Sequence, residues 1–251
     1  MLKLLRINVQ KSTFQMAACG MASKKTPNVA VLLAGCGVND GSEIHEASAI
    51  LTHLSRNGAQ FQCFAPDIPQ MHVIDHFKGS EDCSHKRNVL AESARIARGS
   101  ISPLSDLLKD HPKYDALVIP GGFGVAKNLS DFAGKGPLME VTEDVQKALQ
   151  GFHECKKPIG LACIAPILAA KVFKGVTITL GKSCGDEWPY KDAIEAAQKM
   201  GAKTEEKGVL EVTYDCEHKI FSTPAFMYNG KFHEVDDGIG NMIKELVKSI
   251  A

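Results

Sequence analysis

Short apolar runs at intervals along the chain are the clearest structural signal in the sequence. The runs at 29–34 (VAVLLA), 115–119 (DALVI) and 158–162 (PIGLA) contain few polar residues or none. Continuous apolar runs of this length are typical of parallel strands that are buried on both faces of a sheet. A further strand is predicted over 60–65.

Segments with apolar residues at helical spacing alternate with these strands. The segment 43–57 places Ile44, Ala47 and Ile50 on one face, with Ser42 as the predicted N-cap. Further helices are predicted over 87–98, 103–109, 138–155, 189–200 and 232–248, a strand over 176–180, and a hairpin from 209–213 and 219–222.

The alternation of strands and helices with short connections predicts an α/β fold. Parallel strands joined by helices form a sheet that is covered by helices on both faces. We therefore expect one domain over 29–251, a three-layer αβα sandwich with a mostly parallel, doubly wound sheet of the flavodoxin-like type.

The first 28 residues differ in composition from the rest of the chain. They contain five basic residues and no acidic residue, with serine, threonine and leucine interspersed. This composition is typical of a mitochondrial transit peptide, so 1–28 is predicted to be one and the protein to lie in the mitochondrial matrix. A disordered basic tail is the alternative interpretation.

Charge and hydropathy narrow the classes of partner. The chain has 29 Lys and Arg against 29 Asp and Glu, and removal of the five basic residues of 1–28 leaves 24 against 29. A mildly acidic domain has no general attraction for nucleic acids or anionic membranes, so neither partner is expected. The longest apolar stretch, 161–172, is shorter than the roughly 20 residues that span a bilayer.

The cysteines and glycines give no signal for a bound metal or cofactor. The eight cysteines form no C-x-x-C pair and no Cys/His spacing of a zinc site, so they are expected to be reduced thiols. The glycine-rich segments lack the G-x-G-x-x-G and G-K-S/T patterns of nucleotide sites. We predict neither a metal nor a cofactor.

Three segments that follow predicted strands hold residues suited to chemistry, namely 35–46, 120–128 and 162–166. Ligands of doubly wound sheets bind at the carboxyl ends of the strands. Cys163 lies between small residues where strand passes to helix, as a tight nucleophile turn requires, and Pro166 suits the first helical turn. The positive end of the helix dipole is expected to lower the pKa of the thiol.

Other residues near these strand ends can assist a reactive thiol. Gly121 and Gly122 belong to a P-G-G-F-G run whose bare backbone can direct amides at an oxyanion. Glu46 can hydrogen-bond to a thiolate or relay a proton. His45 and Lys127 can polarise a carbonyl group.

Each of these residues also has an ordinary structural interpretation. A cysteine after a strand is commonly a buried small hydrophobe, and a glycine run is commonly a turn. Acids in the first turn of a helix are stabilised by its dipole whatever their function. His45 and Lys127 can be solvated surface residues. The residues alone leave both interpretations open.

Taken together, the motifs resemble a known family. GCGVNDGSEIHEA, FAPD, RNVLAESARIARG, PGGFGVAKNLSDFA and CIAP follow one another in order, and a late S-T-P-A also matches in kind. The sequence resembles the PfpI branch of the glutamine-amidotransferase-like superfamily, and more narrowly the bacterial ElbB-type proteins with their mitochondrial vertebrate counterparts. The likeness covers nearly the whole chain from Val29 and implies the class I glutamine amidotransferase-like fold.

The resemblance implies roles for four residues. Cys163 takes the nucleophile position and Glu46 that of the acid that contacts it. Gly122 and the amide of Ile164 take the oxyanion-hole positions. Many members of the family have histidine directly after the cysteine, where this chain has Ile164, so a glutaminase activity is not expected.

The remaining set predicts cysteine-dependent glyoxalase or deglycase chemistry on small reactive carbonyl metabolites such as methylglyoxal. The alternative is a non-catalytic redox sensor or interaction protein, in which Cys163 oxidises and Cys36 serves as a second thiol. A homodimer or higher homo-oligomer is expected, because members of the superfamily often form dimers.

Overall fold

A seven-stranded sheet forms the centre of the molecule in the computed structural model, which describes residues 25–250. All neighbouring strands are parallel except the pair at one edge, β10 and β11, which is antiparallel. In spatial order the strands are β10 (Thr213–Asp215), β11 (Ile220–Thr223), β7 (Ile159–Ala162), β6 (Ala116–Ile119), β1 (Asn28–Leu32), β2 (Gln60–Ala65) and β5 (Ile101–Pro103).

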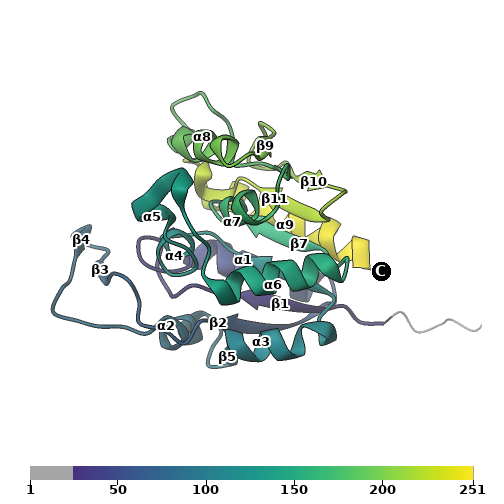
Figure 1. The fold of residues 1–251 in the computed structure, drawn as a ribbon, viewed down its shortest axis with the longest axis horizontal. Coiled ribbons are helices and arrows are strands. Elements are labelled where there is room, and N and C mark those ends of the chain that lie inside the picture. The colour runs from purple at the N-terminus through teal and green to yellow at the C-terminus, as the bar shows by residue number, and fades with distance from the viewer. Residues whose placement is uncertain (1–24, 251) are drawn as a thin grey trace, which may run out of the picture.

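Helices cover both faces of this sheet (Figure 1). One layer consists of α1 (Ile44–Arg56), α2 (Val89–Ile96) and α9 (Phe232–Ile250), and the other of α3 (Leu104–Asp110), α6 (Glu143–Glu154) and α7 (Pro166–Val172). The central strands are buried on both faces, as their apolar runs predict. The predicted three-layer αβα sandwich is therefore confirmed.

The chain winds outward from β1 in both directions. It passes from β1 to β2 and β5, and then returns to the other side of β1 to form β6, β7 and β11. The order reverses between β1 and β6, and crevices for ligands form at the carboxyl ends of strands beside such a reversal. The turns after β1, β6 and β7 meet at this edge of the sheet.

Short elements complete the fold. Helices α4 (Phe123–Lys127) and α5 (Phe132–Lys135) follow β6, and α8 (Lys191–Lys199) packs beside α7. The small hairpin of β3 (Ile74–Asp75) and β4 (Ser80–Glu81) projects from the body of the molecule (Figure 1). The short 3-10 helices are η1 (His111–Lys113), η2 (Gly136–Leu138) and η3 (Ala225–Met227).

Three local predictions were wrong. The first arm of the hairpin, predicted over 209–213, is β10 (Thr213–Asp215). The predicted strand over 176–180 is only β8 (Thr177–Ile178), which pairs with β9 (Lys203–Thr204) outside the main sheet, because side chains of the β10–β11 hairpin occupy the amides of Thr177 and Thr179. The N-cap of α1 is Glu43, whose carboxylate accepts from the amide of Glu46.

Ser42, the predicted N-cap, has a different role. Its hydroxyl oxygen accepts from the amide of Ala34 at 2.8 Å and so joins the start of α1 to the end of β1. The side chain is fully buried, which explains why it is unavailable as a cap.

The folded part of the chain begins before Val29. Asn28 opens β1, its amide donates to Asp115, and Lys25 forms an ion pair with the same carboxylate at 2.7 Å. The rest of the predicted transit peptide, 1–24, lies outside the described residues, and its function as a transit peptide stays a prediction.

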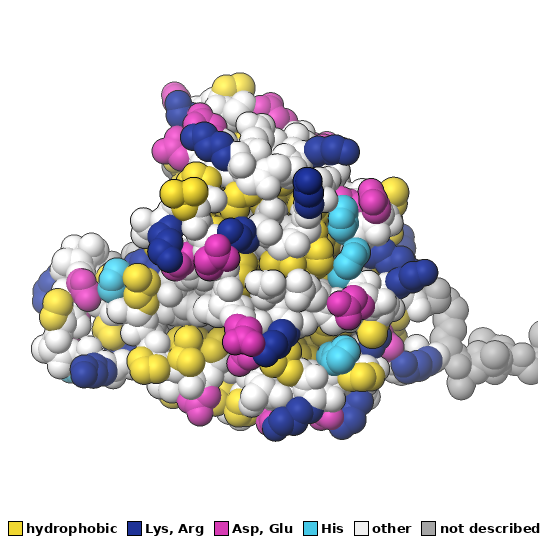
Figure 2. Space-filling model, viewed as in Figure 1, with side chains coloured by type: hydrophobic (Ala, Val, Ile, Leu, Met, Phe, Trp, Pro, Cys, Tyr) yellow, Lys and Arg dark blue, Asp and Glu magenta, His cyan; other side chains and the backbone are white. Residues whose placement is uncertain are grey.

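The surface mixes charges of both signs. On the face drawn in Figure 2, Lys and Arg side chains alternate with Asp and Glu side chains rather than forming one large basic area. Over residues 25–250, none of the helices combines the length and apolar character needed to cross a bilayer.

Candidate active site

Cys163 lies in a strained turn directly after β7. Its φ of 59° is in the left-handed region, which costs a non-glycine residue about 1–2 kcal/mol. The turn is held by its own amide, which donates to the carbonyl oxygen of Thr223 at 3.0 Å, and α7 begins three residues later at Pro166. The predicted elbow between strand and helix is therefore present.

The predicted partners of the thiol surround it. The Glu46 carboxyl and the amides of Gly122 and Ile164 lie close enough to the Cys163 sulfur to shift its pKa, the carboxyl upward and the two amides downward. Cys163 retains 8% of its surface exposed, whereas Glu46 is fully buried. The structure thus brings together the four residues for which the resemblance implied roles.

Glu46 is fixed by backbone donors from two distant parts of the chain. Its Oε2 accepts from the amide of Gly121 at 2.8 Å, and its Oε1 accepts from the amide of Phe226 at 3.1 Å. Two such donors orient both oxygens, so the carboxyl is held against the sulfur without freedom to rotate.

Gly121 and Gly122 are required for these close approaches. A Cβ on Gly121 would overlap Cys163 Cβ and lie 2.7 Å from Glu46 Oε2 and 2.8 Å from the sulfur. Gly122 has a φ of 95°, and a Cβ there would overlap the amide nitrogen of Glu43 and the carbonyl oxygen of Gly41. The glycine pair therefore allows α1, β6 and β7 to meet at one point.

The acid and the thiol share a buried environment that disfavours two negative charges. Burial, together with the charge of Glu43, raises the pKa of Glu46 to about 8. Burial and the charge of Glu46 likewise raise the pKa of Cys163, while the amides of Gly122 and Ile164 act in the opposite direction. At neutral pH the pair therefore holds at least one proton between carboxyl and sulfur.

The sequence interpretation expected the pKa of Cys163 to be lowered, and the surroundings of the sulfur act in the other direction. The reason is that the desolvation of a buried thiolate and a neighbouring carboxylate outweigh the two amide donors. An ionised thiol here requires Glu46 to carry the proton, because this removes the like charge and supplies a donor.

The auxiliary residues lie in different surroundings. His45 Nδ1 contacts Glu43 Oε1 at 2.8 Å, so the imidazole is paired with an acid at the start of α1. Lys127 donates to the carbonyl oxygen of Asn39 at 2.8 Å and lies over the ring of Phe123. The hydrogen bonds among residues 25–250 do not link Lys127 to Cys163.

Cys36 belongs to a different neighbourhood from Cys163. Burial raises the pKa of Cys36, and the charged groups that act on it are Arg95 and Glu92 of α2 and Asp40 in its own loop. The charge that acts on Cys163 is Glu46. Cys36 is a free thiol in the structure.

Two contributors were missed by sequence reasoning. The amide of Phe226 lies 180 residues from Glu46, and only the S-T-P-A match just before it pointed to this segment. Tyr190, directly before α8, has its pKa raised by burial and by the charges of Cys163 and Glu46, which places its phenol near the pair. A half-exposed tyrosine in a loop gives no sequence signal for such a role.

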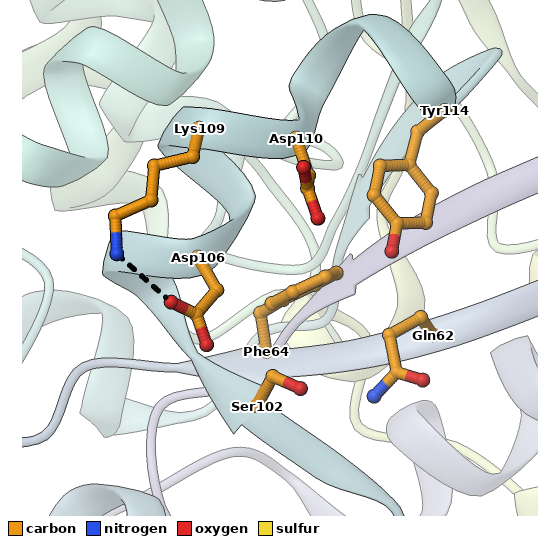
Figure 3. Close-up of a pocket in the computed structure, with 7 residues that line it drawn as sticks. All are labelled: Gln62, Phe64, Ser102, Asp106, Lys109, Asp110 and Tyr114. Carbon is orange, nitrogen blue, oxygen red and sulfur yellow. Dashed lines mark hydrogen bonds and ion pairs between the residues drawn. The ribbon is translucent and has the colours of Figure 1, made fainter.

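Two cavities on other parts of the molecule are lined by none of the predicted site residues. One of about 220 Å³ lies beside β2, β5 and α3, where Tyr114 and Phe64 form one wall and the paired Lys109 and Asp106 another (Figure 3). A second of similar volume lies near Pro158, at the amino end of β7 and so at the opposite edge of the sheet from Cys163. Among residues 25–250, His, Cys, Asp and Glu side chains form no cluster of three suited to a metal ion.

Solved structures define the class of protein. The chain is 36% identical to an isoprenoid biosynthesis protein with an amidotransferase-like domain from Ehrlichia chaffeensis, over 90% of this chain and all of that chain, with a TM-score of 0.81. Drosophila melanogaster DJ-1beta shares the fold at a TM-score of 0.50 and 16% identity, over 90% of this chain and 96% of that one. The fold is that of the DJ-1/PfpI class I glutamine amidotransferase-like proteins.

Curated relatives narrow the class to a family. The chain is 52% identical to the mitochondrial ES1 protein homolog of Rattus norvegicus, over 95% of this chain and 90% of the relative. It is 53% identical to the human mitochondrial glutamine amidotransferase-like class 1 domain-containing protein 3, over 88% and 82% respectively. The chain belongs to the family of mitochondrial ES1 proteins. No protein-family model matches the chain.

These relatives confirm the predicted family and the mitochondrial location. Location in the matrix stays a prediction, as does the predicted homo-oligomer.

Proposed function

We propose that this protein is a cysteine-dependent enzyme that acts on small reactive carbonyl compounds, with glyoxalase or deglycase chemistry on methylglyoxal-like substrates. The observation that carries the proposal is the contact of the Cys163 thiol with the Glu46 carboxyl and with two backbone amides. A nucleophile, a proton carrier and oxyanion donors are the groups that carbonyl addition requires.

The first step is addition of the sulfur to the aldehyde carbon of methylglyoxal. The step starts from the singly protonated pair, in which Glu46 is ionised: a new bond forms between sulfur and carbon, and the thiol proton passes to Glu46 as the carbonyl oxygen gains negative charge. The raised pKa of Glu46, about 8, suits it to hold this proton near neutral pH. The amides of Gly122 and Ile164 lie beside the sulfur, where that charge develops.

The second step moves hydrogen within the bound adduct. Glu46 returns its proton to the oxygen and then removes the hydrogen on the former aldehyde carbon as a proton, which leaves an enediolate with its negative charge on the neighbouring oxygen. Return of that proton to the neighbouring carbon, with transfer of the hydroxyl proton to the neighbouring oxygen, gives a thioester of lactate. Water then cleaves the thioester, which releases lactate and restores the thiol, so that one methylglyoxal and one water give one lactate with no external oxidant or reductant.

The activity can be tested by incubating the full chain with methylglyoxal and measuring D- and L-lactate. We expect Cys163→Ala to abolish turnover and Glu46→Gln to lower kcat by roughly 100-fold or more. Cys155→Ser is the matched control, because Cys155 is an exposed thiol at the end of α6. No lactate above background, or turnover that survives Cys163→Ala, would remove the enzyme proposal.

A redox sensor is the second candidate, and the raised pKa of Glu46 is the observation that favours it. A protonated carboxyl can donate to a sulfinate on Cys163, and the amides of Gly122 and Ile164 supply further donors. Peroxide treatment followed by mass spectrometry of each cysteine peptide tests this candidate. Selective formation of sulfinate at Cys163, combined with absence of turnover, would favour it over the enzyme.

A further inference from the structure

His45 and Glu43 form a contact pair at the entrance to α1. Nδ1 of His45 lies 2.8 Å from Oε1 of Glu43. Because an ionised carboxylate only accepts hydrogen bonds, Nδ1 must carry the hydrogen, and a neutral His45 therefore has its free acceptor at Nε2. The carboxylate of Glu43 is largely buried, whereas the His45 ring is more than half exposed.

Glu43 connects this pair to the candidate catalytic acid. Its second oxygen, Oε2, accepts from the amide of Glu46 at 2.7 Å. The backbone amide of Glu43 donates to the carbonyl oxygen of Gly121, whose own amide holds Glu46 Oε2. Glu43 is thus the only acid in the described chain that both caps α1 and adjoins Glu46 through this short network.

Aromatic rings hold His45 in place. Its ring lies 4.6 Å from that of Phe232 and 6.3 Å from that of Phe226, measured between ring centroids. The amide of Phe226 donates to Glu46 Oε1, so the segment that packs on His45 also orients the acid. The His45 ring therefore packs against Phe232 on one side, while more than half of the side chain stays exposed.

We propose that His45 is a positioning residue for Glu46, acting through Glu43: its imidazole fixes the Glu43 carboxylate and balances the charge that this carboxylate presents to the buried acid. The proposal differs from direct polarisation of a substrate carbonyl, since His45 contacts the acidic network. Its meaning for catalysis rests on the proposed function, because the acid that it positions is the partner of Cys163.

The charges that face Glu46 make the direction of the effect clear. They come from Glu43 on its own segment, Cys163 after β7 and Tyr190 before α8. The negative charge of Glu43 raises the pKa of Glu46. Loss of the His45 donor leaves the Glu43 charge less balanced and so raises the pKa of Glu46 further. Loss of the Glu43 charge lowers the pKa of Glu46, so the two changes act in opposite directions.

The test measures the alkylation rate of Cys163 by iodoacetamide between pH 5 and 10 in the full chain, resolved by mass spectrometry of the cysteine peptide. His45→Gln raises the pKa of Glu46, so the carboxyl stays neutral to higher pH and disfavours the thiolate less. We therefore expect the midpoint of the rate profile to move downward by about half a pH unit. Glu43→Gln retains an oxygen to cap α1 but loses the charge. Glu46 then ionises at lower pH and its charge disfavours the thiolate, so we expect the midpoint to move upward by about one unit.

His53→Gln is the matched control. His53 lies on the same helix and also contacts an acid, Asp236 of α9 at 3.1 Å, but it is two turns further from the helix start than His45. Its profile is expected to superimpose on that of the unaltered protein. A His45→Gln profile that also superimposes, or moves in the same direction as that of Glu43→Gln, would overturn the proposal.

This experiment separates the inference from the proposed function, because it requires no substrate. Opposite shifts in the two variants, together with absent methylglyoxal turnover, would support the positioning role and remove the enzyme activity. Normal turnover with unshifted profiles would support the enzyme activity and overturn the positioning role of His45. Thermal unfolding of each variant verifies that a shift reflects the site and not a loss of folded protein.

Discussion

At the scale of single residues, Gly121 controls how closely the thiol and the acid approach. Because a Cβ at this position would overlap Cys163 and crowd Glu46, we predict that Gly121→Ala separates the pair. Overpacking of this kind costs about 1–3 kcal/mol of folding stability. The expected result is a lower Tm, measured by calorimetry, together with a downward shift of the pH midpoint of Cys163 alkylation, because the carboxylate that raises the pKa of the thiol moves away.

Gly134→Ala serves as the comparison for Gly121→Ala. Gly134 lies in α5, and a Cβ there would have open space around it. Alanine is the better helix former, so this variant should be as stable as the unaltered protein or slightly more stable. Equal stability of the two variants would show that the space at Gly121 is not limiting.

The residues of the site differ in how far the sequence could reveal them. Cys163 and Glu46 were predictable because each follows an apolar strand at the edge where parallel strands end. The contribution of Phe226 was not, because its backbone amide acts and an amide has no sequence signature. The direction of the pKa of Cys163 was also not predictable, because it depends on burial and on a carboxylate brought close by folding.

At the scale of elements, the residue after α6 has a strained backbone conformation that a glycine substitution can relieve. Lys156 follows the helix with a φ of 56°, and its amide donates to the carbonyl oxygen of His153. This left-handed position favours glycine, so we predict that Lys156→Gly raises the free energy of unfolding by about 0.5–1 kcal/mol. Chemical denaturation measures the change.

The same substitution inside the helix should have the opposite effect. Glu154 is the last helical residue of α6, and Glu154→Gly is expected to lower stability by up to about 1 kcal/mol, because glycine is a poor helix former. If Lys156→Gly also destabilised the protein, contacts of the lysine side chain would outweigh the backbone strain.

Element length decided which parts of the fold could be predicted. The strands β1, β2, β6 and β7 have four to six residues each, and all were predicted; β1, β6 and β7 are continuous apolar runs. The missed strands, β3, β4, β5 and β9, have two or three residues each. Such short segments pair only because the surrounding fold brings them together, and no periodicity marks them.

At the scale of the whole molecule, one buried acid couples folding to pH. The pKa of Glu46 is raised to about 8 from its ordinary value of 4.5, so the folded chain retains a proton that the unfolded chain has released. The stabilisation from this proton is complete below about pH 4.5 and is lost as the pH rises through about 8. The total effect is on the order of a few kcal/mol.

Glu46→Gln isolates this effect, because glutamine does not titrate. The variant has a penalty of roughly 1–3 kcal/mol that does not change with pH. Two backbone amides donate to the two oxygens of Glu46, but glutamine has only one oxygen, so its NH₂ group faces one of these donors. We predict that the Tm of the unaltered protein exceeds that of the variant most at pH 5 and that the difference shrinks by several degrees by pH 9. Titrations of other groups occur in both proteins and cancel in the difference.

An exposed substitution on α9, Glu245→Gln, should leave the difference flat across this range. A difference for Glu46→Gln that stays constant or grows with pH would mean that the acid is ionised in the folded protein, and the proton shared with Cys163 would then be absent.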